Sequence, residues 1–272
     1  MGTGSVNYIP LGYGDVAIAA ILVVVNGLLS LWFALGLERQ LAIATVRMLV
    51  QLILVGLVLH VLFDAMSLFW TLLAALVMIG FAGREAIARQ ERPFTGWWSY
   101  GLGTSTMMIA GALVTILALT TAVRPEPWYD PRFAIPMLGM ILGNTMNGIS
   151  LGLNTLTVGA ARERNAVEAR LALGATRWEA LGTVTRGALR SGMMPIINSM
   201  SATGLVSLPG MMTGQILSGV PPEQAVKYQL LIMFLIAGAT AIGSLAAVML
   251  GAYRLTDYRH RLRLDRLRTV RR

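Results

Sequence analysis

The 272-residue sequence has no Cys, only two His and a single Lys. Without Cys, disulfide frameworks, cysteine zinc sites, iron–sulfur clusters and thiol catalysis are excluded, and two His leave little room for a multi-His metal site within one chain. The single Lys, Lys227, is followed by Tyr228, whereas a phosphate-binding P-loop requires Gly-Lys followed by Ser or Thr. The chain therefore has no such ATP site, and we expect ATP and its Mg²⁺ to be bound by a partner.

Charged residues are also scarce. They make up 13% of the chain, about half the fraction of ~25% that a soluble protein needs for its surface, and apolar residues make up 56%. The mean hydropathy is +0.66. This composition predicts an integral membrane protein, and the net charge of +9 has to be interpreted within that class.

Seven apolar segments approach the ~20 residues that a helix needs to cross the hydrocarbon layer. They predict an all-α, polytopic helix bundle with about seven transmembrane helices. The third segment is short, and the sixth is interrupted by Pro and Gly. The segments are Val16–Leu37, Leu41–Phe63, Leu68–Gly83, Gly103–Val123, Phe133–Val158, Ser191–Ser218 and Tyr228–Tyr253.

The basic residues indicate the orientation, because Lys and Arg concentrate in cytoplasmic connections. Eighteen of the 22 fall in one alternating set of connections and three in the other. We therefore expect the N-terminus outside, the C-terminus in the cytoplasm, and one transmembrane domain over residues 1–272 with a cytoplasmic insertion at 159–190. The first span lacks the features of a cleaved signal and is expected to be retained. The basic tail, residues 254–272, is expected to anchor at anionic lipid rather than bind nucleic acid.

The cytoplasmic insertion predicts a helix, a tight turn at Gly174 and a second helix. Thr176-Arg-Trp-Glu179 fits a capping box, in which Thr176 and Glu179 bond to each other's backbone amides. Trp178 follows in the first turn, where its side chain can point toward a partner. Two interpretations remain: a solvated connector, or a docking element for a motor protein.

Several motifs favour docking. The stretch from Glu168 to Thr176 resembles, in part, the Glu-Ala-Ala…Gly signature of ABC-transporter permeases, with Arg170 in place of the second Ala. Gly204-Leu-Val-Ser-Leu-Pro-Gly-Met-Met212 is more specific and resembles the FetB-type permease family, which includes iron-export permeases and plant aluminium-tolerance proteins. Arg47-Met-Leu-Val-Gln51, Gly139-Met-Ile-Leu-Gly-Asn144 and Ala225-Val-Lys-Tyr-Gln229 match the same pattern.

This resemblance implies a permease of the bacterial inner membrane that exports a metal ion, iron being the expected one. It also implies a separate cytoplasmic ATPase. Independently of the resemblance, we expect a homodimer, because seven helices are few to enclose a path. The residues expected to contact the ATPase are Glu168, Ala169, Gly174, Ala175, Thr176, Trp178 and Glu179.

Polar residues within spans are costly and suggest a translocation path. Arg47 and Gln51 share a helical face; Arg47 either extends to the headgroups or gates the path. Asn144, Asn147 and Asn154 also share a face, which serves either helix packing or a path whose amide oxygens suit a hard cation. We expect lipid on the opposite face, formed by Leu142, Met146, Ile149, Leu153 and Leu156.

In the sixth segment Pro209 breaks the helix and frees backbone carbonyls, a feature that often marks a substrate site in transporters. Met211 and Met212 follow it, and their thioethers serve either packing or a soft metal ion.

Two other functions remain as alternatives. One is a secondary transporter or channel that works without an ATPase. A more distant one is an intramembrane serine hydrolase, since Gly148-Ile-Ser150-Leu-Gly152 has the Gly-x-Ser-x-Gly spacing, with His60 the only base within the spans.

Overall fold

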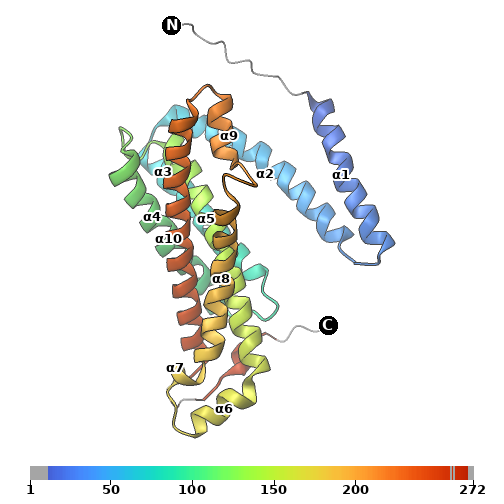
Figure 1. Cartoon of the computed structure of the whole chain (residues 1–272), viewed down its shortest axis with the longest axis vertical. Helices are drawn as coiled ribbons and strands as arrows, with labels where there is room; N and C mark the ends of the chain where they lie inside the picture. Colours follow the sequence, from blue (N-terminus) through green and yellow to red (C-terminus); the bar gives the residue numbers. More distant parts are fainter. Residues whose placement is uncertain (1–11, 258, 260, 269–272) are drawn as a thin grey trace. The chain divides into compact units, whose positions relative to one another are not determined.

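The computed structural model describes residues 12–257, 259 and 261–268, and every regular element among them is a helix. The prediction of an all-α fold is confirmed. Figure 1 shows the order of the elements along the chain. They are α1 (Tyr13–Trp32), α2 (Glu38–Ala65), α3 (Leu68–Ala88), α4 (Trp97–Leu117), the π-helix η1 (Ala118–Val123), α5 (Pro131–Arg162), α6 (Arg164–Ala172), α7 (Arg177–Ala180), α8 (Gly182–Ala202), α9 (Gly210–Leu217), α10 (Pro222–Arg254) and the 3₁₀-helix η2 (Leu264–Arg266).

The chain divides into two compact units. The first comprises Met1–Ala65 with the short segment Leu217–Val220, and the second comprises Met66–Ile216 and Pro221–Arg272. In the first unit α1 and α2 pack on each other, and Ser30 joins them by donating to Glu38 Oε2 over 3.1 Å. Most side chains of both helices are exposed and apolar, as expected of helices that face lipid. The single domain expected over residues 1–272 stays a prediction.

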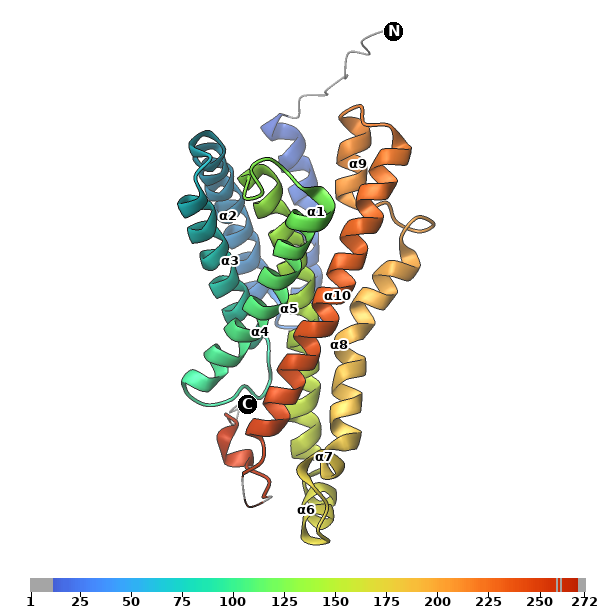
Figure 2. The ribbon, with the colours of Figure 1, turned by 90° about the vertical axis from the view of Figure 1, so that its left-hand side faces the viewer.

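In the second unit α5 is the central helix. It packs against α3, α4, α8 and α10, and α8 and α10 also lie side by side, as Figures 1 and 2 both show. The core contains Ile149, Leu153 and Leu156 of α5, Val248 of α10 and Met107 of α4. This arrangement makes one expectation wrong. The face of α5 formed by Leu142, Ile149, Leu153 and Leu156 is buried in protein and does not meet lipid, because helices surround α5 on that side; Met146 is partly buried against the same core.

Two glycines allow α5 and α8 to approach closely. A Cβ atom built on Gly148 would lie 2.8 Å from the backbone oxygen of Gly192, and one built on Gly192 would lie 2.8 Å from the backbone oxygen of Gly148. Ser244 of α10 lies at the same crossing, with its Oγ 2.9 Å from the Gly148 position. Only residues without a side chain fit here, so the small residues of α5 serve close helix packing.

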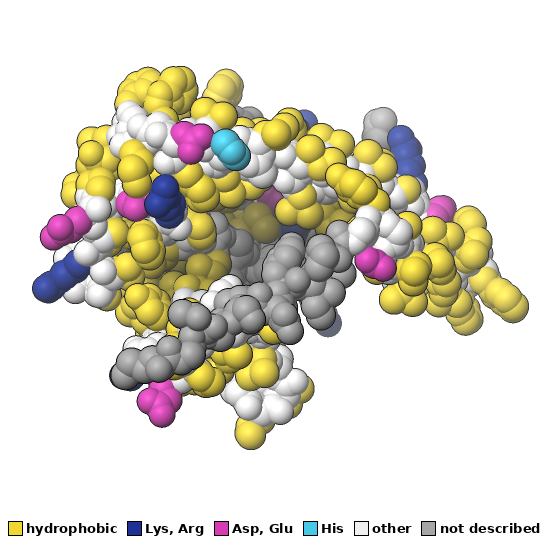
Figure 3. All heavy atoms as spheres, turned by 90° about the horizontal axis from the view of Figure 1, so that it is seen from above, with side chains coloured by type: hydrophobic (Ala, Val, Ile, Leu, Met, Phe, Trp, Pro, Cys, Tyr) yellow, Lys and Arg dark blue, Asp and Glu magenta, His cyan; other side chains and the backbone are white. Residues whose placement is uncertain are grey.

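Five helical segments of the described chain are long and apolar enough to cross a membrane: α1, α2, α3, α4 continued by η1, and α10. The protein is a multi-pass membrane protein. The helices α5 and α8 are also long but more polar, because α5 carries Asn and Gly and α8 carries Arg and Ser along much of their length. In the view of Figure 3, hydrophobic side chains predominate and charged ones are scattered.

The sixth predicted segment, Ser191–Ser218, differs from the structure at its start and in its interior. The helix α8 already begins at Gly182, continues through Pro195 and ends at Ala202. Residues 203–209 are not helical, and α9 starts at Gly210. We expected the helix to be interrupted at Pro209. The observed non-helical stretch is wider than that, and Pro209 is its last residue.

Candidate functional site

The insertion between α5 and α8 forms an elbow of α6, a turn and α7, which we define as residues 164–180. At its turn Glu179 Oε2 accepts hydrogen bonds from the backbone N and the Oγ1 of Thr176, both at 2.8 Å. Thr176 Oγ1 in turn accepts from the backbone N of Glu179. The predicted capping box is confirmed. The hydrogen bond from the Thr176 backbone, followed by that from its side chain, lowers the pKa of Glu179 below its usual value.

The turn itself depends on Gly174, which has a φ of +88° and a Cβ position open to solvent. Its neighbour Leu173 is 88% exposed and Trp178 is 47% exposed. The inner side of the elbow is well packed, since Val167, Ala180 and Leu181 are buried in the core. The elbow is therefore a firm element that presents two large apolar side chains outward.

Arg170, which departs from the permease signature, stabilises this elbow. Its Nη1 donates to the backbone oxygen of Ala180 at 3.3 Å and to Thr183 Oγ1 at 3.4 Å, so it links α6 to the start of α8. Glu168 pairs with Arg164 on the same helix at 2.9 Å. Ala169 and Ala175 belong to the same elbow. The contact of any of these residues with an ATPase stays a prediction.

The C-terminal tail packs on the α3–α4 connection. The backbone N of Thr95 donates to the oxygen of Arg266, and the N of Arg268 donates to the oxygen of Pro93, both at 2.8 Å. Leu267 is buried in the same core as Phe94. A bidentate pair with Arg263 lowers the pKa of Asp265 to about 2. The described part of the basic tail is therefore folded against the α3–α4 connection, and we call this packed segment the brace. Its contact with lipid stays a prediction.

A polar pocket of about 400 Å³ lies between the end of α3, α5 and α8. Arg89 Nη1 donates to Asn147 Oδ1 at 3.2 Å, and the backbone N of Glu91 donates to Asn154 Oδ1 at 2.9 Å. The structure thus brings together two of the three predicted Asn residues. Asn144 instead donates to the backbone oxygen of Met140 in its own helix. The pocket is lined by Arg89, Asn147, Ser150, Leu151, Asn154 and Pro195.

The other predicted path residues are not part of the lining of this pocket. Arg47 and Gln51 are exposed on α2, in the first unit. The backbone oxygen of Pro209 accepts from the N of Thr213, and Met211 packs on the core cluster that includes Ile196 and Ile236. A role for Met211 or Met212 in transport stays a prediction. In the described part of the chain, no group of three or more His, Asp or Glu side chains is arranged to hold a metal ion.

Sequence reasoning missed Arg89 and Pro195 as members of a site. Arg89 entered only the count of basic residues, because it follows a span in a short connection. Pro195 was noted only as an interruption. The one available signal was the spacing of Asn147, Ser150 and Asn154, which places all three along one side of α5.

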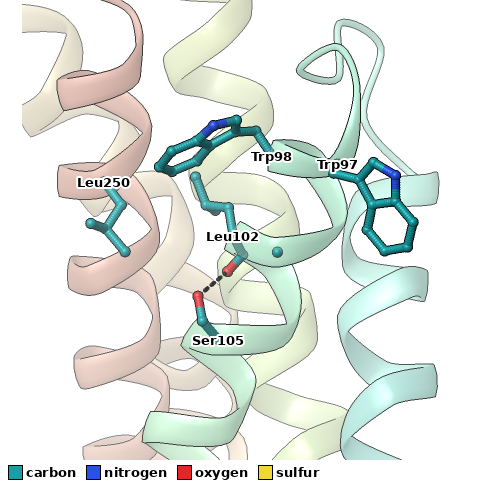
Figure 4. A pocket seen from close by; sticks show the side chains of 6 residues that line it. Trp97, Trp98, Leu102, Ser105 and Leu250 are labelled. Carbon is teal, nitrogen blue, oxygen red and sulfur yellow. Dashed lines mark hydrogen bonds between the residues drawn. The ribbon is translucent and has the colours of Figure 1, made fainter.

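A second pocket of about 360 Å³ is an apolar groove between α4 and α10. In Figure 4 the ring of Trp98 extends toward Leu250 of α10. Ser105, the one polar side chain in its lining, donates to the backbone oxygen of Leu102. Arg254 lies over the Trp98 ring, 4.8 Å from its centroid. This arrangement is typical of aromatic residues at a membrane interface.

Residues 13–256 match the model of a family described as an uncharacterised protein family, UPF0014. The chain belongs to the UPF0014 family. The match includes both the elbow and the polar pocket, and it ends just before the part of the tail that packs on the α3–α4 connection.

Curated relatives of this UPF0014 protein cover most of its length. A UPF0014 membrane protein of Synechocystis is 38% identical over 79% of this chain and 82% of its own. The "Probable iron export permease protein FetB" of Escherichia coli is 31% identical over 93% and 96%. "Protein ALUMINUM SENSITIVE 3" of Arabidopsis thaliana is 32% identical over 86% and 84%. No solved structure matches. The predicted resemblance to FetB-type permeases is confirmed, and this UPF0014 protein is a membrane permease.

Proposed function

We propose that this UPF0014 protein is the membrane-spanning subunit of an ATP-driven exporter of a metal ion, iron in particular, in the bacterial inner membrane. ATP and Mg²⁺ bind to a separate cytoplasmic ABC ATPase, and the chain itself is not an enzyme. Two copies of the chain, each with one ATPase, form the transporter. Seven crossings, by α1, α2, α3, α4, α5, the α8–α9 segment and α10, place the N-terminus outside and the elbow and tail in the cytoplasm.

The observation that carries this proposal is the form of the elbow. A solvated connector has no need of a capping box, a buried inner side and the Arg170 link between its two ends. It also has no reason to expose two large apolar side chains, Leu173 and Trp178, within six residues of each other around the turn. Large apolar side chains exposed on a rigid element are typical of residues that bind in a groove of a partner protein.

The position of the elbow in the chain suggests how the ATPase acts. The helix α5 ends at Arg162 and α6 starts at Arg164, while α7 is followed directly by α8 at Gly182. The elbow therefore joins the two helices that contribute Asn147, Asn154 and Pro195 to the polar pocket. Movement of the elbow by a bound ATPase displaces the pocket walls relative to each other. The choice of iron is supported by the name of the Escherichia coli relative.

Co-purification with the ATPase tests the docking role. The tagged full-length chain is co-expressed with the ABC ATPase of the same organism, and the ATPase retained per permease is measured. The variant Leu173→Ala with Trp178→Ala should retain about tenfold less ATPase or lower, because truncation of buried apolar anchors commonly costs at least that much affinity.

The matched control is Trp97→Ala, which removes another exposed Trp, from the start of α4. Its recovery of ATPase should equal that of the unaltered protein. Equal recovery by the elbow variant would count against docking at this surface. A secondary transporter or channel remains the competing function, and it would transport iron in vesicles that contain no ATPase.

A further inference from the structure

We propose that the polar pocket of Arg89, Asn147, Ser150 and Asn154 binds an oxyanion, a carboxylate or phosphate group, and not a bare metal cation. The proposal rests on the proposed function where it treats the bound group as part of the cargo. It then names the class of that cargo: a metal ion carried as an anionic complex.

The two Asn amides of the pocket have a fixed orientation. Arg89 and the backbone N of Glu91 can only donate hydrogen bonds, so the atoms of Asn147 and Asn154 that face them must be the Oδ1 oxygens. Each of these amide oxygens, the kind of ligand that a cation would need, therefore already accepts a hydrogen bond and has one lone pair left. The Nδ2 groups remain, and each is a pair of N–H donors.

Arg89 brings a positive charge to the pocket. Its Nη1 bonds to Asn147, and its Nη2 lies 3.7 Å from Glu85 Oε1 in a half-exposed pair along the same helix end. That distance and exposure make the pair weak. A guanidinium has five N–H donors in a planar fork that matches a carboxylate or a phosphate, so Arg89 keeps donors for such a group. The same charge repels a bare cation.

The size and the remaining lining of the pocket also suit an oxyanion. Leu151 and Pro195 supply apolar walls beside these polar groups. Ser150 adds a hydroxyl that can donate. The volume of about 400 Å³ is within the ~300–1,000 Å³ usual for small-molecule sites and far exceeds that of one metal ion.

Two sources of such a group have the same chemistry. One is a soluble anion, such as the carboxylates of a metal chelate. The other is the phosphate of a lipid headgroup. Both place oxygen acceptors against Arg89 and the Asn N–H groups, and the experiment separates them.

The experiment measures binding to the full-length chain in phosphatidylcholine nanodiscs, without any ATPase, by titration calorimetry. The probes are citrate, the iron(III)–citrate complex, inorganic phosphate, and the chlorides of iron(II) and manganese(II). In a parallel arm the nanodiscs contain phosphatidylglycerol, and lipid retained on the chain is identified by native mass spectrometry. The variants are Arg89→Gln and Asn154→Leu, and the control is Arg186→Gln, an exposed Arg of α8 that is not part of the pocket lining.

If the pocket binds a soluble anion, citrate, its iron complex or phosphate should bind to the unaltered chain. Arg89→Gln should weaken this binding about tenfold or more, and Arg186→Gln should leave it unchanged. If the pocket binds a lipid headgroup, phosphatidylglycerol should be retained on the unaltered chain and lost from the Arg89→Gln variant. Asn154→Leu should weaken the same binding, and thermal unfolding of each variant shows that it is folded.

Three results would overturn the proposal: no binding of any of these anions or lipids, anion binding that Arg89→Gln leaves unchanged, or binding of iron(II) or manganese(II) alone that exceeds that of the anions. Failure of the proposed function is a separate outcome. In that case no ATPase associates with the elbow, whereas anion binding to the isolated chain persists.

Discussion

Arg177 at the start of α7 lies over the ring of Tyr253 at the end of α10, with its guanidinium carbon 4.9 Å from the ring centroid. The same side chain donates from Nη2 to the backbone oxygen of Asp257 at 3.5 Å. Arg177 therefore links the elbow to α10 and to the tail. The tail in turn is bonded to the α3–α4 connection, where Glu91 contacts Asn154 of the pocket. The elbow and the pocket thus belong to one connected set of packed elements.

The Arg177→Ala substitution should loosen this link. A cation–π contact contributes ~0.5–1 kcal/mol at an exposed site, so the elbow should open more often while the bundle stays folded. We expect faster amide hydrogen exchange in residues 173–180, by about two- to fivefold. The control is Arg186→Ala, which removes an exposed Arg nearby in sequence. Unchanged exchange in the elbow of Arg177→Ala would show that this contact does not hold it.

The Gly174→Ala substitution should lower ATPase recruitment by straining the turn. The φ of +88° is costly for a residue with a Cβ atom, by roughly 1–2 kcal/mol, while nothing lies within 4 Å of the added atom. The effect therefore comes from the backbone alone.

Gly182→Ala is the matched control for this turn, because Gly182 also has open space around its Cβ position but begins a helix. It should recruit ATPase normally. Co-purification with the ATPase measures both variants, and equal recruitment by Gly174→Ala and Gly182→Ala would show that the shape of the turn is unimportant.

The Gly148→Ala substitution should destabilise the crossing of α5 and α8. Its Cβ would lie 2.8 Å from a backbone oxygen, and the helices must separate to admit it, at a cost of roughly 1–3 kcal/mol. Gly143→Ala in the same helix meets nothing within 4 Å and should be neutral or stabilising, since Ala favours a helix. Thermal unfolding in detergent measures both. A Tm for Gly148→Ala at or above that of Gly143→Ala would contradict the packing described.

The brace formed by the tail should be sensitive to acid through Asp265. Its pKa is lowered from 3.8 to about 2 by Arg263, so its contribution to stability is fully present above about pH 3.8 and is lost as the pH falls toward 2. Asp265→Asn removes this contribution at neutral pH. We expect faster trypsin cleavage after Arg266 and Arg268 in that variant, with Glu223→Gln as the control. Cleavage of Asp265→Asn at the rate of the unaltered chain would show that the pair does not hold the tail.

The features that sequence predicted well are local. Thr176 and Glu179 are three residues apart, and helix geometry alone brings them into hydrogen-bonding distance. The apolar segments likewise predict helices, because a membrane requires backbone groups to be satisfied within each segment. The presence of a break at Pro209 follows from the properties of Pro, whereas its start just after Ala202, well before Pro209, was not predicted.

The features that sequence did not predict depend on distant neighbours. Arg89 and Asn147 are 58 residues apart, and nothing in either segment indicates that they meet. Leu153 and Leu156 were wrongly expected to face lipid, because an apolar face that packs on other helices has the same composition as one that packs on lipid. The tail is basic in composition, yet Leu267 is buried with Phe94 through contacts that its charge does not reveal.

The most direct test of the account is transport by the purified chain in sealed vesicles, with and without its ABC ATPase. The vesicles are loaded with iron as the citrate complex, and its movement is followed together with ATP hydrolysis. The account predicts transport only when both the ATPase and ATP are present on the side of the elbow. Equal transport by the chain alone, driven by ion gradients and indifferent to ATP, would contradict it.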